Sequence, residues 1–153
     1  MGLSFSVPKG IKVPPSLKNI YKELVQDISG FKEPDHGCLE KWAKDGVLLL
    51  NATLTVEAGQ QNNHASFGWQ KFTDHVIMTV SDRCSPAVFM LWGGFAHKKE
   101  ELIDNNKHKV IKIGHPSPLS NPESFPKFKG SRCFSECNKF LTQINQTPID
   151  WSL

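Results

Sequence analysis

Three short apolar runs constrain the fold of this chain more than any other feature of its sequence. Residues 47–50 read Val-Leu-Leu-Leu, and residues 87–92 and 110–113 are also mainly apolar. The first run shows no alternation with polar residues, which is typical of a strand covered on both faces in a parallel sheet. Because helical patterns separate the runs, the sequence predicts an α/β fold: a three-layer sandwich with a short central parallel sheet.

The helices are predicted from apolar spacing and from their end signals. A first helix is expected from Ser16, its N-cap, to near Gly30. Further helical patterns occupy residues 39–44, 67–80 and 96–104. A last helix is expected to start at the N-cap Ser131, with an inward face made of Phe134, Cys137, Leu141 and Ile144.

The cysteines do not form a disulfide framework. They are Cys38, Cys84, Cys133 and Cys137, and no CxxC pair exists. The last two are four positions apart, on one face of the predicted last helix, so they are either buried free thiols, which we favour, or metal ligands. Reduced cysteines indicate a reducing compartment.

Charge and hydropathy exclude some classes of protein and leave one choice open. The net charge of +3 lies wholly within residues 98–153. No apolar run approaches the ~18 residues of a membrane span, so we expect no membrane association. Residues 1–15 also lack the apolar core of a secretory signal. The basic part either meets a polyanion through phosphate contacts or is a solvated surface.

Polar or flexible residues follow each of the three apolar runs. They are Asn51, the pair Gly93 and Gly94, and His115. Ligands of parallel α/β sheets bind beyond the carboxyl ends of the strands, so these groups could share one cleft. A side-chain amide can read a nucleobase edge, and a Gly pair lets backbone approach a phosphate. Taken singly, they could instead be a turn former, a loop and a satisfied polar group.

Two apolar side chains stand outside any amphipathic pattern. Phe5, between two serines, either stacks on a base or fills the core. Leu119, in a loop of proline and serine, is either a scattered exposed leucine or a wedge of the kind that proteins insert into a DNA stack.

Several long motifs then occur in an order that resembles the family 1 uracil-DNA glycosylases. They are GLSFSV at 2–7, PPSLKNIYKEL at 14–24, GVLLLNATLTV at 46–56, GWQKFTD at 68–74, LWG at 91–93, HPSPLS at 115–120 and PIDW at 148–151. The resemblance covers residues 2–151 and is specific, because the motifs at 46–56 and 115–120 together leave little room for another family.

The resemblance implies a role for each matching position. Asn51 would hydrogen-bond the uracil edge, Phe5 would stack on the flipped ring, and His115 would be the catalytic donor to a uracil oxygen. Leu119 would enter the duplex as the base leaves. The residues implied in contacts with the DNA backbone are Pro14, Pro15, Ser16, Gly93, Gly94 and Ser117.

The function implied is hydrolysis of the N-glycosidic bond of uracil in DNA by base flipping, the first step of base-excision repair. The resemblance implies single- or double-stranded uracil-containing DNA as the partner, no metal or organic cofactor, and a monomer. The compartment implied is the nucleus or mitochondrion in a eukaryote and the cytoplasm otherwise.

Two departures from the family pattern shape these expectations. Gly94 stands where family members commonly have Ser, so a hydroxyl contact is lost. The family's Gly-Gln-Asp-Pro-Tyr-His motif, with its water-orienting Asp, and the strand that leads into it should precede Gly2. We therefore expect residues 1–153 to be an N-terminally truncated catalytic domain, lacking the first strand, poorly folded and with at most trace activity. The alternative is a catalytically impaired DNA- or protein-binding remnant.

Overall fold

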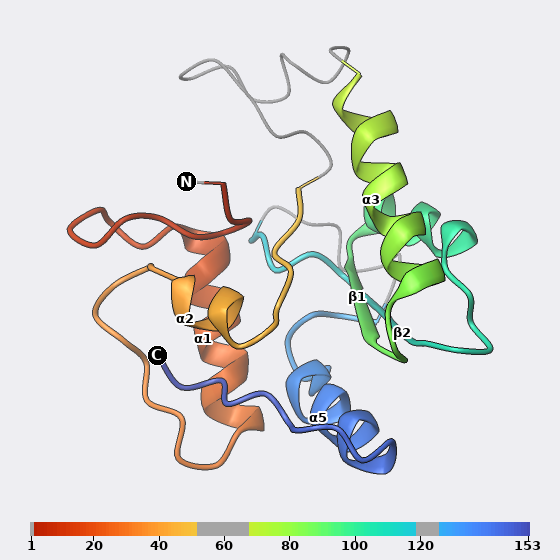
Figure 1. Cartoon of the computed structure of the whole chain (residues 1–153). Coiled ribbons are helices and arrows are strands. Elements are labelled where there is room, and N and C mark those ends of the chain that lie inside the picture. The colour runs from red at the N-terminus through yellow and green to blue at the C-terminus, as the bar shows by residue number, and fades with distance from the viewer. Residues whose placement is uncertain (1, 52–67, 119–125) are drawn as a thin grey trace.

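The computed structural model of the chain describes residues 2–51, 68–118 and 126–153, and Figure 1 shows how its elements are arranged. Among these residues the elements are α1 (Pro15–Asp27), α2 (Glu40–Lys44), α3 (Trp69–Arg83), β1 (Val88–Trp92), α4 (Gly94–His97), the 3-10 helix η1 (Lys98–Leu102), β2 (Lys109–Ile113) and α5 (Cys133–Gln143).

The sheet of the described residues consists of β1 and β2, which run parallel. Their register pairs Val88 with Lys109 at one end and Trp92 with Ile113 at the other. The α4 and η1 helices form the crossover between the two strands. The α/β class, the parallel order and the two predicted strands at 87–92 and 110–113 are confirmed. Both strands end at the same edge, where the candidate site lies.

The prediction of a strand at residues 47–50 is wrong for the described part of the chain. This segment has no regular secondary structure there, although the Leu49 carbonyl accepts a hydrogen bond from the Ser4 N–H over 3.2 Å. Val47 and Leu49 pack against the core while Leu48 is 64% exposed, so the side chains alternate as they would in a strand. A strand also needs a ladder partner, which an apolar run in a sequence cannot reveal.

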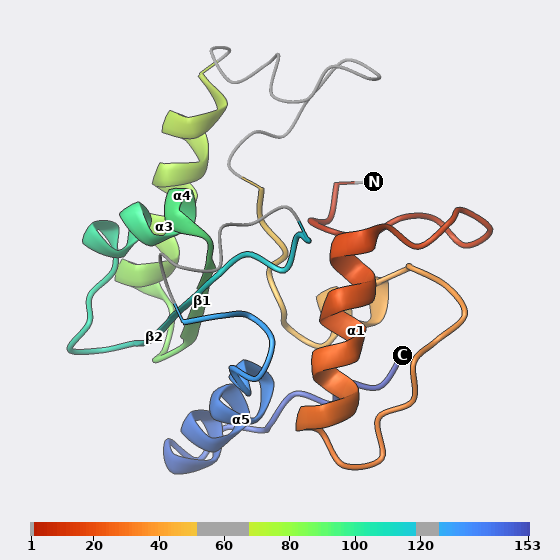
Figure 2. The ribbon, with the colours of Figure 1, turned by 180° about the vertical axis from the view of Figure 1, so that it is seen from behind.

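The hydrophobic core lies between α1, α2, α5 and the sheet, and the C-terminal segment closes it. Figure 2 shows this segment running from α5 back to α1. Within it, Trp151 is 4% exposed and packs edge-on against Trp42, with 5.4 Å between ring centroids, and against Phe134, at 5.0 Å. The Trp42 indole N–H donates to the Trp151 carbonyl over 2.9 Å. The PIDW motif thus joins α2 to α5.

Neither serine that was predicted as an N-cap takes that position. Helix α1 has Pro14 as its N-cap and Pro15 as its first residue. Proline suits this first position because its ring fixes φ near the helical value. It lacks a backbone N–H, but the N–H of a first helical residue has no partner within the helix. Helix α5 follows Arg132, not Ser131.

Carboxylates from α1 bind the first turn of α5. The Glu23 carboxylate accepts hydrogen bonds from the Gly130 and Arg132 N–H groups over 2.7 and 2.9 Å, and Asp27 accepts one from the Ser135 N–H over 2.9 Å. Negative charge at a helix N-terminus also suits the helix dipole. The capping groups of α5 therefore come from another helix.

The prediction that Cys133 and Cys137 are buried free thiols is confirmed, and Cys84 is exposed. Burial raises the pKa of Cys133 to about 12 and that of Cys137 to about 11, because a thiolate is poorly solvated there.

We expect Cys84 to be alkylated by iodoacetamide at pH 8 while Cys133 and Cys137 stay protected until the chain unfolds, as peptide mass spectrometry can measure. The raised pKa values of Cys133 and Cys137 also make the free energy of unfolding depend on pH. The unfolded thiols ionise first, so the stabilising contribution is complete below about pH 9 and is lost as the pH rises through the native values. Alkylation of the native chain at Cys133 as fast as at Cys84 would contradict this.

Candidate active site

The loops after β1 and β2 are in direct contact. The Gly93 N–H donates to the Ile113 carbonyl over 2.9 Å. Gly93 has φ of 91°, which side chains rarely adopt, and a Cβ atom at this position would lie 3.2 Å from the Cβ of His115. Glycine is therefore required here both by the backbone and by the close approach of His115.

His115 is held in one tautomer. The Ser117 N–H donates to its Nδ1 over 3.0 Å, so Nδ1 is the acceptor and the ring proton of the neutral imidazole is on Nε2. Partial burial lowers the pKa of His115 below its ordinary value, because the imidazolium is poorly solvated. The Asn19 side chain anchors the same loop by donating to the Pro116 carbonyl over 2.7 Å. At neutral pH, His115 therefore carries a neutral N–H donor.

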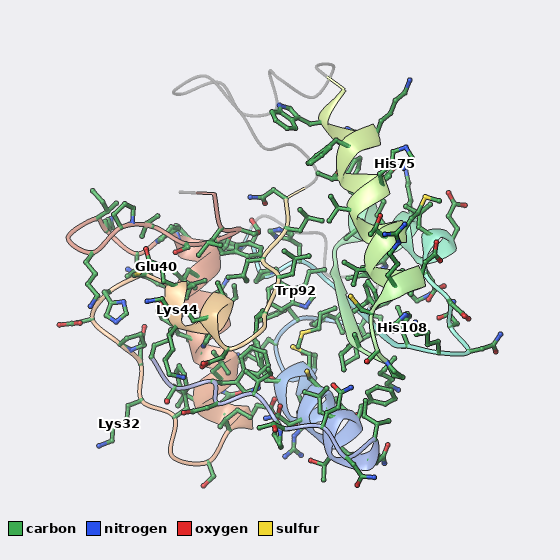
Figure 3. The ribbon with its side chains drawn as sticks, viewed as in Figure 1. Lys32, Glu40, Lys44, His75, Trp92 and His108 are labelled. Atoms are coloured by element: carbon green, nitrogen blue, oxygen red, sulfur yellow. The ribbon has the colours of Figure 1, made fainter. Side chains whose placement is uncertain are left out.

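Phe5 lies beside His115. Their ring centroids are 5.6 Å apart, and the Phe5 ring is equally far from Trp92, which Figure 3 labels. The Ser6 N–H bonds to the Leu3 carbonyl over 3.2 Å, and within this turn Phe5 has φ of 64°, the left-handed region that is unusual for a bulky residue. Phe5 is half-buried: its ring packs against the hydrophobic core and also lies beside His115 at the end of the sheet.

Asn51 reaches the same site through the residue before Phe5. Its amide Oδ1 accepts a hydrogen bond from the Ser4 hydroxyl over 3.0 Å. Asn51 itself is exposed. The predicted neighbourhood of Asn51, Phe5 and His115 is therefore connected by contacts. Sequence reasoning missed Ser4, whose one signal was its place inside the GLSFSV motif.

Of the residues predicted to meet the DNA backbone, Gly93 and Ser117 contact His115, and Ser16 is the second residue of α1. Pro14 and Pro15 begin α1, one turn before Asn19, and Gly94 is the first residue of α4. Ser117 is next to the His115 loop and also fixes its ring. Leu119 lies outside the described residues.

The described residues contain no group of three or more His, Cys, Asp or Glu side chains that could hold a metal ion. Among the same residues, no helix has both the length and the apolar character needed to cross a membrane. The chemistry on offer is thus a side-chain amide, an aromatic ring and a neutral imidazole N–H.

The chain is similar to known proteins in sequence and in fold. The sequence model of the Uracil DNA glycosylase superfamily matches residues 1–142. The uracil-DNA glycosylase of Caenorhabditis elegans is 60% identical over 152 residues, which are 99% of this chain and 52% of that protein. That of Campylobacter fetus is 56% identical over 153 residues, 100% of this chain and 64% of that protein.

A crystal structure of the mimivirus uracil-DNA glycosylase superposes with a TM-score of 0.93 at 34% identity, over 100% of this chain and 60% of that one. This chain therefore spans about half to two thirds of the length of the relatives that it matches.

Proposed function

Because this chain belongs to the uracil DNA glycosylase superfamily, we propose that it binds uracil in DNA and acts in hydrolysis of the N-glycosidic bond. The observation that carries this proposal is the neutral His115, whose Nδ1 accepts from the Ser117 N–H so that its ring proton is on Nε2, beside the Phe5 ring. The relatives named above carry the same activity in their names.

The proposed reaction places negative charge on the departing base. As the bond breaks, the sugar becomes cation-like and uracil leaves as an anion, with charge on its carbonyl oxygens. A donor fixed in advance stabilises such charge without reorganisation. The Ser117 N–H and the Pro116 anchor hold His115 in place for this purpose. A neutral imidazole donates a hydrogen bond to the departing base without transferring its proton to it.

Recognition of the base is assigned to Phe5 and Asn51. The ring of Phe5 offers a face on which a flipped base can stack. Uracil presents an acceptor oxygen at position 4 and a donor N–H at position 3, and one amide can pair with both. Cytosine presents a donor at position 4 and an acceptor at position 3, so the same amide orientation leaves polar groups unpaired.

The Asn51 side chain provides the test of this proposal. In a version of the chain that carries the family's Asp motif, we expect Asn51→Ala to weaken uracil excision sharply with no gain on cytosine, whereas Asn51→Asp should lose uracil activity and gain some on cytosine. The reason is that unpaired polar groups cost about 1–3 kcal/mol each in a dry pocket. The measurement is single-turnover excision with protein in excess, on single strands that differ only in one uracil or cytosine. Full uracil activity in Asn51→Ala would make Asn51 a structural turn residue.

A second candidate function is binding to uracil-containing DNA without hydrolysis. It is favoured by the chemistry of the site, since none of the site residues described above is a carboxylate that could orient a water molecule. Fluorescence anisotropy with the same oligonucleotides separates the two functions. Preferential binding of the uracil strand together with no excision would establish this second candidate.

A further inference from the structure

We propose that Ser4 determines base specificity, because its hydroxyl group holds the Asn51 amide in the orientation that accepts uracil and rejects cytosine. This inference rests on the proposed function, in which Asn51 reads the base edge. It assigns a role to a residue that does not itself contact the base.

Two hydrogen bonds join Ser4 to the segment that carries Asn51. The Ser4 hydroxyl donates to Oδ1 of Asn51 over 3.0 Å, and the Ser4 N–H donates to the Leu49 carbonyl over 3.2 Å. Ser4 is 6% exposed, so its hydroxyl is screened from bulk water. The next residue is Phe5, whose ring contacts His115. One turn therefore supports both base-recognition groups.

The direction of the hydroxyl bond distinguishes the two orientations of the amide. In the observed orientation the hydroxyl proton has Oδ1 as its acceptor. If the amide turned over, Nδ2 would face Ser4 and could donate to the hydroxyl oxygen, but the hydroxyl proton would lose this acceptor. Among the described residues, the Ser4 hydroxyl donates to Oδ1 of Asn51. A buried hydroxyl without an acceptor is unfavourable, so Ser4 selects the observed orientation.

The orientation that Ser4 disfavours is the one that cytosine requires. Uracil and cytosine exchange donor for acceptor at positions 3 and 4, and turning the amide over exchanges its oxygen and nitrogen. Leaving the Ser4 hydroxyl proton without an acceptor corresponds to about tenfold in the ratio of the two orientations. Ser4 is thus expected to account for about tenfold of the discrimination between the bases.

The test compares Ser4→Ala with Ser4→Thr in the full chain. Affinities for single strands that differ only in one uracil or cytosine are measured by fluorescence anisotropy, and excision is followed under single turnover. In Ser4→Ala we expect the ratio of the affinity for the uracil strand to the affinity for the cytosine strand to fall about tenfold. Ser4→Thr keeps the hydroxyl and should stay within about twofold of the unchanged chain. Ser29→Ala, at an exposed position after α1, is the matched control and should leave the ratio unchanged.

An unchanged ratio in Ser4→Ala, including an equal loss of affinity for both bases, would overturn the inference and leave Ser4 with a structural role. If circular dichroism shows that Ser4→Ala is unfolded, Ser4→Cys takes its place. The thiol is a weaker donor, so its ratio should fall between those of the unchanged chain and the Asn51→Ala variant. A wild-type chain with no preference for uracil would instead overturn the proposed function, and this inference with it.

Discussion

Replacing His115 by leucine is expected to lower the single-turnover rate of uracil excision by about 10²–10³-fold, the usual cost of losing a fixed donor to developing negative charge. Binding of uracil-containing DNA should change far less, because the donor acts mainly as the bond breaks. Rates are measured with protein in excess, and affinities by fluorescence anisotropy. A fall in affinity that matched the fall in rate would show that His115 binds the ground state.

The pH dependence gives a second measurement on His115. Its pKa lies below the ordinary 6.5, because burial disfavours the imidazolium. A charged ring could not accept the Ser117 N–H at Nδ1, so the rate should stay level as the pH falls through 6.5 and decline only in more acidic solution. The free energy of unfolding also falls with the pH, because His115 takes up a proton in the unfolded chain before it does so in the folded chain. The stabilising contribution of His115 is complete above pH 6.5 and is lost as the pH falls toward the pKa of His115 in the folded chain. A midpoint above 6.5 would contradict the neutral donor.

Replacing Trp151 by alanine is expected to destabilise the chain by ~3–5 kcal/mol, as measured by urea denaturation. The indole fills the space between Trp42 and Phe134, so its removal leaves a cavity where α2 and α5 meet. Trp151→Phe keeps a ring and should lose less. Thr147→Ala, an exposed position in the same segment, should change the free energy of unfolding by less than about 0.5 kcal/mol. A loss below about 1 kcal/mol in Trp151→Ala would show that the core does not depend on this residue.

The sequence predicted those features that have a local signal. The strands β1 and β2 are apolar runs that end at glycine, and their shared direction brought Gly93 and His115 together as expected. The segment 47–50 has the composition of a strand, but the pairing that makes a strand depends on distant backbone. Composition alone could not supply it.

Capping and support of the site were not predictable for the same reason. The Asp27 carboxylate that binds the start of α5 is 108 positions from Ser135, and the nearby Ser131 was the more obvious local cap. Ser4 reads as one more small polar residue until its hydroxyl is seen against Asn51, which lies 47 positions away. Such partners are set by tertiary packing, which overrides local preference.

The two carboxylates of α1 also have a consequence for the order of assembly during synthesis. Glu23 and Asp27 emerge from the ribosome before the backbone donors that satisfy them, because Gly130 and Ser135 are translated 107 and 108 positions later. Until then, docking α1 into a core would bury two acids with no donors, so the helix has reason to stay hydrated. Contacts of such long sequence separation form slowly. The nascent chain should therefore gain its protease-resistant core only after helix α5 has left the exit tunnel.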